Sequence, residues 1–350
     1  MENARPTPLW ALELGELPTD HHFRRDHFGV PELDPAGWRL EVAGAVEQPL
    51  SLSLAQVQAL PAQTLKVVLE CAGHRRTELD PPAEGIPWGA GAVGEARWAG
   101  APLRELLALA RPSRRAAAAV LEGADRGPFA HLAGEFSFAR CLPLAKALDR
   151  DTLLAWQMNG APLPAAHGAP LRAVVPGWYA TDSVKWLVRI ELIEGEYDGP
   201  FEALDYRLGD DRLTELPVHA LVTSPAEGAE VIPGPLDVGG VAWGGRGGGK
   251  AVEVRIDGGD WDAAACDPPA GPYALTRWRA RVELSPGGRT IAVRATDGAG
   301  RSQPETPLWN PRGYANASVH RVRVRVRAER DRIGERQAKD LRRPLEADWR

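Results

Sequence analysis

Val67-Val68-Leu69-Glu70-Cys71-Ala72-Gly73-His74-Arg75-Arg76 is the most informative stretch of this sequence. Three β-favouring apolar residues lead into Cys71 at the end of a predicted strand, and a turn of small residues then presents two arginines. A thiolate beside guanidinium groups can bind a metal and an oxyanion together, because positive charge favours thiol ionisation and grips anionic oxygens. The alternative for any single cysteine is an inert, buried small hydrophobe.

The composition limits the size and class of the protein. A chain of 350 residues is too long for one ordinary core, so we expect two domains. The chain is 44% hydrophobic and 25% charged, and its net charge of -5 argues against a nucleic-acid or membrane-surface binder. An anionic substrate would therefore need a local basic pocket.

Compartment and redox state are predicted from what the sequence lacks. No segment approaches the roughly 20 apolar residues of a membrane span. Residues 1–6 lack the apolar run of a signal peptide, so we expect a cytoplasmic protein, or a periplasmic one if a leader is missing. Cys71, Cys141 and Cys266 are odd in number and far apart, which favours neither a disulfide framework nor a zinc site. We expect Cys71 to be a specialised thiol and the other two to be buried bystanders.

The chain divides near residues 216–217 in this interpretation. Residues 1–215 predict an irregular α+β domain, with short strands, short helices and frequent Pro and Gly between them. Helices are expected at 54–60 and 103–110, the first stopped by Pro61 and the second begun by Pro102. Strands are expected at 38–43, 65–69, 152–158, 171–175 and 184–193.

Residues 216–330 predict an all-β sandwich, because helical periodicity is nearly absent and Gly-rich turns separate short apolar runs. Hairpin-type turns are expected at 257–259 and 286–288. Residues 320–327 alternate perfectly, which predicts valines in the core and arginines in solvent. Residues 331–350 are charged and predict a tail, or an arm that packs on a partner. Strands are expected at 218–223, 236–243, 251–256, 279–284, 290–295 and 320–327.

A glycine-rich segment at residues 244–250 matches the first part of a phosphate-binding P-loop. The motif then needs Ser or Thr to hold magnesium, but the next residue is Ala251, and a strand is expected where the motif needs a helix. We therefore interpret the segment as a flexible loop between strands.

Several further motifs combine basic and polar side chains. Taken singly, each has a plain structural explanation, such as a satisfied loop histidine or a surface charge. They are Phe23-Arg24-Arg25-Asp26-His27, Met158-Asn159-Gly160-Ala161-Pro162-Leu163-Pro164, His167-Gly168-Ala169-Pro170-Leu171-Arg172, the run 176–187 with Val184-Lys185-Trp186-Leu187, Asp205-Tyr206-Arg207 and Trp309-Asn310-Pro311-Arg312-Gly313.

In this order and at these spacings, the motifs resemble the sulfite oxidase family of molybdenum enzymes. The resemblance runs from about residue 23 to residue 326, and the pair Trp178-Tyr179 is similar to bacterial members. It implies a molybdopterin domain of irregular α+β type, followed by an immunoglobulin-like dimerisation domain. No segment similar to the cytochrome b5 domain of animal members is expected.

The resemblance also implies a role for each matched residue. Cys71 would be the thiolate ligand of molybdenum, whose other ligands would be the molybdopterin dithiolene and oxo groups. The residues that would hold the pterin and its phosphate are His27, His167, Arg172, Ser183 and Lys185. The residues that would form the oxyanion pocket are Arg25, Arg76, Trp88, Tyr206 and Arg312.

The implied reaction is oxidation of sulfite to sulfate by oxygen-atom transfer from a molybdenum-oxo centre. Electrons would leave one at a time to a separate acceptor, such as a c-type cytochrome or oxygen, and the protein would be a homodimer. One alternative is an oxidoreductase of the same fold that acts on nitrate or a sulfoxide. A second is a cofactor-free relative whose second domain mediates association, which would purify without molybdenum.

Three positions differ from the family pattern. Glu84 precedes the turn Gly85-Ile86-Pro87-Trp88, where animal and plant members carry lysine, so the pocket loses one expected cation. His74 stands where asparagine is usual, either filling the turn or joining a proton path. Asp26 also stands where asparagine is common.

Overall fold

The computed structural model describes residues 4–130 and 132–328, and the tail expected at 331–350 lies outside them. The described chain is mostly β with few helices. Its longest helix, α2 (Leu103–Ala110), has 8 residues, and the others are α1 (Leu54–Gln58), α3 (Leu144–Ala147) and α4 (Pro200–Ala203). No helix among the described residues is long and apolar enough to cross a membrane.

Two five-stranded sheets make up most of the first part of the chain. One has the order β4-β3-β12-β7-β8, and in the other β10-β9-β6-β5 is joined by β11, which pairs with β9. The strands of the first sheet are β3 (Arg39–Gly44), β4 (Leu50–Ser53), β7 (Ala118–Pro128), β8 (Glu135–Pro143) and β12 (Leu187–Ile193). Those of the second are β5 (Gln63–Glu70), β6 (Val93–Pro102), β9 (Leu153–Met158), β10 (Ala161–Pro162) and β11 (Arg172–Val174).

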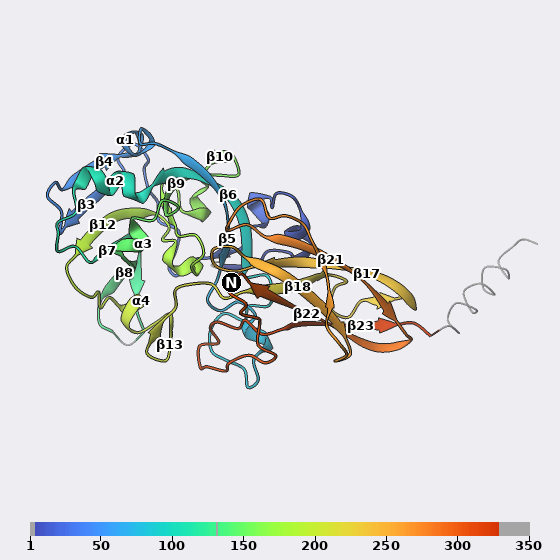
Figure 1. Ribbon diagram of the computed structural model, residues 1–350. Helices are drawn as coiled ribbons and strands as arrows, with labels where there is room; N and C mark the ends of the chain where they lie inside the picture. The colour runs from blue at the N-terminus through green and yellow to red at the C-terminus, as the bar shows by residue number, and fades with distance from the viewer. Residues whose placement is uncertain (1–3, 131, 329–350) are drawn as a thin grey trace, which may run out of the picture.

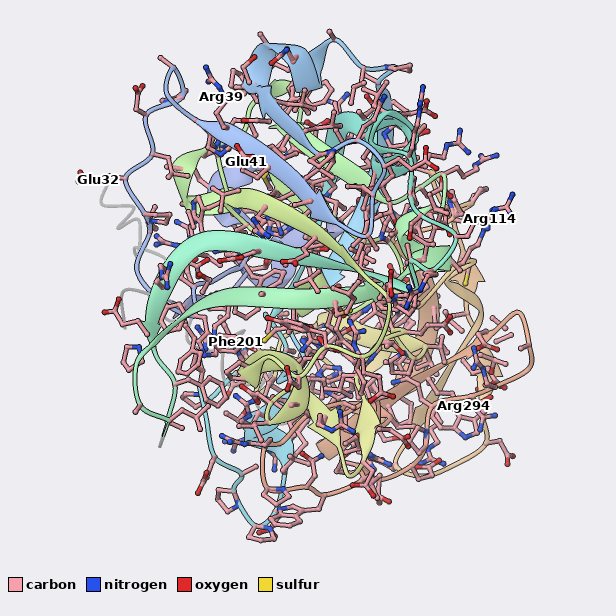
Figure 2. All side chains as sticks on the ribbon, turned by 90° about the vertical axis from the view of Figure 1, so that its left-hand side faces the viewer. Glu32, Arg39, Glu41, Arg114, Phe201 and Arg294 are labelled. Carbon is pink, nitrogen blue, oxygen red and sulfur yellow. The ribbon has the colours of Figure 1, made fainter. Side chains whose placement is uncertain are left out.

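A core of aliphatic side chains supports the first of these sheets. In β3, Leu40 and Val42 are buried, whereas Arg39 and Glu41 point away from the core (Figure 2). Leu103 and Leu107 of α2 belong to the same cluster. The alternation in β3 and the apolar stripe of α2 explain why these two elements could be predicted.

Two more sheets form the second part of the chain and gather at one end of the molecule (Figure 1). Their orders are β15-β17-β21-β20 and β16-β23-β22-β18-β19. The first contains β15 (His219–Ser224), β17 (Gly234–Trp243), β20 (Ala265–Cys266) and β21 (Thr276–Leu284). The second contains β16 (Glu230–Val231), β18 (Gly249–Ile256), β19 (Asp262–Ala263), β22 (Gly287–Asp297) and β23 (His320–Val326).

The alternation predicted at the end of the chain is confirmed in β23. Val322, Val324 and Val326 are buried in the core between the two sheets, and the arginines between them are exposed. Burying every second side chain fixes the register of the strand, because a shift of one residue would expose all three valines.

Two short ladders and five 3-10 turns complete the described elements. The ladders pair β1 (Ala4–Arg5) with β2 (Arg24–Arg25) and β13 (Arg207–Leu208) with β14 (Asp211–Arg212). The turns are η1 (Leu9–Glu13), η2 (Thr19–His21), η3 (Arg76–Glu78), η4 (Ala165–His167) and η5 (Ala180–Asp182).

Most predicted elements are present, with three corrections. The strand expected at 184–193 begins only at Leu187, so Lys185 lies in a loop. The turn at 286–288 joins β21 to β22, which belong to different sheets, so the hairpin prediction is wrong there. Cys266 is exposed and not buried, whereas Cys141 is buried as expected. The glycine-rich run at 244–250 does connect two strands, β17 and β18.

Candidate active site

Cys71 directly follows β5, and its side chain lies where two pockets meet. Its backbone N–H donates to the carbonyl of Ala92 at 2.9 Å, and its carbonyl accepts from the N–H of His74 at 2.9 Å. Burial raises the pKa of the Cys71 thiol, and the charges of Arg25 and Arg76 only partly oppose this. The two arginines favour ionisation of the thiol, as expected, but burial has the larger effect on its pKa. A bound metal cation would supply the missing charge.

The two arginines that follow this loop point in different directions. Arg75 turns away from the pockets: its Nε donates to Glu78 at 2.8 Å and its Nη1 to the carbonyl of Ser318 at 2.5 Å. Arg76 lines the second pocket, where its Nη1 donates to the carbonyl of Ile86 at 2.7 Å and its Nε to that of Arg312 at 2.8 Å. Only one of the pair is thus available to bind an anion.

Three glycines from separate segments enclose the side chain of Arg76. A Cβ atom at Gly73 would lie 2.4 Å from Nη2, and one at Gly85 would lie 2.7 Å from Nη1. A Cβ atom at Gly313 would lie 2.7 Å from Cγ. Gly85 and Gly313 also have positive φ angles, of 113° and 58°, which glycine adopts without strain. The backbone therefore holds the guanidinium in one position.

Arg25, His27 and Tyr206 form a hydrogen-bonded group beside Cys71. Nη2 of Arg25 and the hydroxyl of Tyr206 each lie 3.3 Å from Nδ1 of His27. Burial, and then the charge of Arg25, lowers the pKa of His27 to about 4, so the imidazole is neutral near pH 7. A guanidinium can only donate hydrogen bonds, so Nδ1 of His27 acts as an acceptor and orients Arg25.

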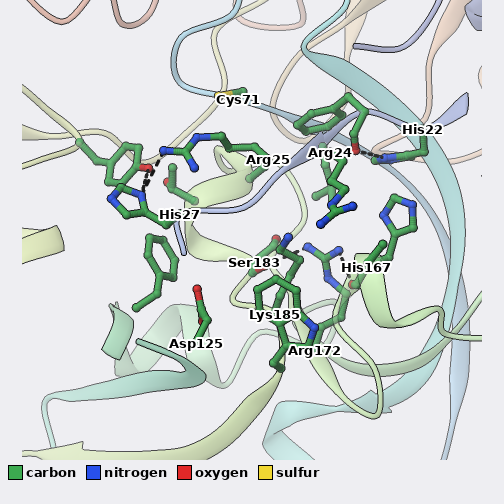
Figure 3. Close-up of a pocket in the computed structure, with 18 residues that line it drawn as sticks. His22, Arg24, Arg25, His27, Cys71, Asp125, His167, Arg172, Ser183 and Lys185 are labelled. Carbon is green, nitrogen blue, oxygen red and sulfur yellow. Dashed lines mark hydrogen bonds between the residues drawn. The ribbon is translucent and has the colours of Figure 1, made fainter. Parts of the chain in front are cut away.

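The first pocket contains every residue predicted to hold the cofactor. His27, Cys71, His167, Arg172, Ser183 and Lys185 all line it (Figure 3). Sequence reasoning missed three ionisable lining residues: His22 and Arg24, which adjoin or belong to the motif 23–27, and Asp125, which no local pattern indicated.

Buried positive charge characterises this pocket. Arg172 donates to the carbonyls of His167 and Ser183 at 2.9 Å, and its guanidinium lies 4.7 Å from the centre of the Trp98 ring. No ion pair joins Arg172 to a carboxylate in the described part of the chain. Burial lowers its pKa to about 9 and that of Lys185 to about 8. A bound phosphate would compensate these charges, so the residues present fit a phosphate-bearing cofactor.

The second pocket contains every residue predicted to form the oxyanion site. Arg25, Arg76, Trp88, Tyr206 and Arg312 line it. Trp88 is buried and lies edge-on to Phe23, with ring centres 6.5 Å apart, so it forms a rigid wall. Glu84 lines the same pocket from an exposed position. The pockets share Arg25, His27, Cys71 and Tyr206, so an anion in the second pocket would lie close to the Cys71 thiol.

His74 does not line either pocket. It is buried against His219 and Trp243, with ring centres 5.8 and 5.7 Å away, and neither ring nitrogen of His74 has a described hydrogen-bond partner. Burial lowers its pKa well below the usual value. These contacts favour the interpretation that His74 fills the turn over a place in a proton path.

The two parts of the chain match two protein families. Residues 27–201 match the oxidoreductase molybdopterin binding domain, and residues 210–327 match the Mo-co oxidoreductase dimerisation domain. The mitochondrial sulfite oxidase of Homo sapiens is 36% identical over 93% of this chain and 64% of its own length. The chain thus spans a little under two thirds of that relative.

Two further relatives cover more of their own length. The sulfite oxidase of Arabidopsis thaliana is 30% identical, over 93% of this chain and 92% of that protein. The crystal structure of the sulfane dehydrogenase SoxCD from Paracoccus pantotrophus matches with a TM-score of 0.81 and 30% identity, over 92% of this chain and 84% of that one.

The matched domains, the shared fold and the thiol between two basic pockets place the chain in the molybdopterin-dependent oxidoreductases. More closely, it belongs to the sulfite oxidase family of these enzymes. Its cofactor is molybdopterin carrying molybdenum.

Proposed function

We propose that this protein oxidises sulfite to sulfate by oxygen-atom transfer and passes the electrons singly to a separate acceptor. The observation that carries the proposal is the meeting of the two pockets at Cys71. One pocket offers buried cations for a phosphate-bearing cofactor, and the other offers three arginines and a tyrosine for a small oxyanion.

Cys71 would hold the molybdenum, and the residues of the first pocket would hold the pterin. Lys185 and Arg172 supply charge for the phosphate, while His167 and Ser183 supply neutral polar contacts. Burial keeps the pKa of His167 well below neutrality, so it offers the cofactor a neutral imidazole. When bound, the cofactor supplies the oxygen-atom transfer and accepts two electrons.

The protein's own residues would bind, orient and enclose sulfite. Arg25, Arg76 and Arg312 would give charge-assisted hydrogen bonds to its oxygens. The hydroxyl of Tyr206 would donate one more, because burial raises its pKa far above neutrality and keeps it protonated. Trp88 would exclude water from one side of the pocket. None of these side chains needs to act as a nucleophile.

The architecture supports a finer description of the fold. We propose that residues 1–215 form the irregular α+β molybdopterin domain and that residues 216–330 form an immunoglobulin-like sandwich. The sandwich would pair two copies of the chain into a homodimer, as its match to a dimerisation domain suggests. The acceptor would be a c-type cytochrome or oxygen, and the cytoplasmic location stays a prediction.

Steady-state oxidation of sulfite tests the proposed function. Protein of known molybdenum content would be assayed with ferricyanide as electron acceptor, and we expect turnover in proportion to molybdenum occupancy. Full occupancy without sulfite turnover would contradict the proposed substrate. Assays with nitrate and a sulfoxide would then test the alternative substrates.

A further inference from the structure

Asp26 is completely buried beneath the first pocket. It lies between Arg25 and His27 in the sequence, is 0% exposed, and is not among the residues that line the pocket. Its carboxylate forms ion pairs with Lys185 and Arg24. Both of these cations line the pocket, so Asp26 neutralises part of their charge although it does not line the pocket itself.

The charge on Asp26 is the main compensation for the cations of this pocket. Arg24, Arg172 and Lys185 line the pocket together with Arg25, which the second pocket shares. The charge of Asp26 raises the pKa values of Arg172 and Lys185 against the effect of burial. Asp125 also lines the pocket, but burial raises its pKa to about 7. No ion pair joins Asp125 to a cation in residues 4–130 or 132–328.

We propose that Asp26 is a built-in counterion for the phosphate-binding cations of the first pocket. It keeps Arg24 and Lys185 in place before the cofactor binds, and it limits how strongly the pocket attracts phosphate. The cations of the pocket, Arg25 included, outnumber the single carboxylate of Asp26, and a phosphate monoester, with nearly two negative charges at pH 7, would compensate much of the remaining positive charge. The inference rests on the proposed assignment of Arg172 and Lys185 to the cofactor phosphate.

The charge of Asp26 can be removed without changing its shape. In Asp26→Asn, Arg24 and Lys185 would become like charges with no carboxylate between them. We expect this variant, prepared as the full chain from cells that make no molybdopterin, to melt at a lower temperature than wild type. We expect it to bind inorganic phosphate roughly tenfold more tightly by calorimetry, because a repulsive charge near the anion is gone. The melting temperature should therefore rise more with added phosphate than it does in wild type.

Two further variants act as controls. Asp237→Asn makes the same chemical change at a side chain that is 83% exposed, and should alter neither quantity. The double variant Arg24→Gln, Asp26→Asn removes Asp26 together with one of its two cations and restores the wild-type net charge. It should return the melting temperature and the phosphate affinity to near their wild-type values, and it can be measured even if Asp26→Asn alone does not fold.

The outcomes separate this inference from the proposed function. Equal phosphate affinity in wild type and Asp26→Asn would overturn the counterion role while leaving the cofactor site intact. A double variant that binds phosphate as tightly as Asp26→Asn would also overturn it. Phosphate binding that Lys185→Met does not weaken, or no binding by wild type, would refute the phosphate site itself and the inference with it.

Discussion

Arg76 is the arginine of the second pocket whose position is most closely determined by its surroundings. Two backbone carbonyls accept hydrogen bonds from Nη1 and Nε of Arg76. A Cβ atom at any of the three surrounding glycines would collide with its side chain. Nη2 has no hydrogen-bond partner among the described residues. A preorganised donor of this kind binds an anion without losing conformational freedom.

Arg76→Gln should therefore weaken sulfite binding strongly. Removing charge at a buried anion contact costs about 2–5 kcal/mol, so kcat/KM for sulfite should fall by at least about thirtyfold. Molybdenum content should stay at the wild-type level, and Arg97→Gln, at an arginine that is 47% exposed, should change neither. A variant that loses its molybdenum would instead assign Arg76 to the cofactor.

Glu84 gives the second pocket a negative charge at its edge. It is exposed, and its backbone N–H donates to the carbonyl of Pro311 at 3.0 Å. Glu84→Lys should lower the KM for sulfite a few-fold, with an effect that shrinks as salt is added, because exposed charges are screened. Glu47→Lys, elsewhere on the surface, is the matched control. An unchanged KM would show that Glu84 does not act on the substrate.

At the level of elements, the second part of the chain holds the loop that carries Cys71. Nε1 of Trp243, in β17, donates to Glu70 at 2.6 Å, and His219 of β15 lies 3.3 Å from the same carboxyl group. Asn316 donates to the carbonyl of Arg75 at 3.1 Å. The proposed metal ligand is thus positioned by residues far away in the sequence.

Trp243→Phe tests this link. The change removes the hydrogen bond to buried Glu70, so the free energy of unfolding should fall by about 1–3 kcal/mol, and molybdenum retention should fall with it. Trp278→Phe is the matched control, because Trp278 is equally buried but its Nε1 has no described partner. Equal losses in the two variants, measured by urea unfolding and metal analysis, would argue against a positioning role.

Elements with a clear periodic pattern were predictable from the sequence, and three of the longer strands were not. The alternation in residues 320–326 and the apolar stripe of α2 gave correct predictions. Strand β6 was missed because it buries glycines and a charged residue, Glu95, which pairs with Lys66 at 2.7 Å. Strands β7 and β8 lack alternation, and a bulge in β7 interrupts their pairing.

The candidate site likewise has features that the sequence predicted and features that it did not. Motifs with fixed spacing indicated every residue predicted to bind the cofactor or the oxyanion, but not other lining residues such as His22 and Asp125. The different directions of Arg75 and Arg76 were not predictable, because they depend on contacts more than 200 residues away in the sequence. The ion pair between Asp26 and Lys185 is likewise a product of tertiary structure.

At the scale of the whole molecule, buried histidines make stability depend on pH. Burial lowers the pKa of His219 and of His320 to about 3, and that of His22 to about 4, below the usual 6.5. Between pH 6.5 and about 4 the unfolded chain therefore binds protons that the folded chain does not. The contribution of these neutral histidines to the free energy of unfolding is complete above pH 6.5. It decreases as the pH falls, by up to roughly 1.4 kcal/mol per histidine and pH unit.

We accordingly expect the midpoint of urea unfolding to fall markedly between pH 7 and pH 5. The measurement is best made without cofactor, because a bound phosphate would act on the histidines of the first pocket. A midpoint that stays constant over this range would show that these histidines are protonated in the folded protein.

The central claim is that Cys71 binds the molybdenum at which sulfite is oxidised. The most direct test is sulfite oxidation, with ferricyanide as acceptor, by wild type and Cys71→Ser, each with its molybdenum and pterin content measured. We predict turnover in wild type and none in Cys71→Ser, while the variant keeps its fold, as judged by circular dichroism. Undiminished turnover per molybdenum in Cys71→Ser would contradict the assignment of Cys71 as the metal ligand.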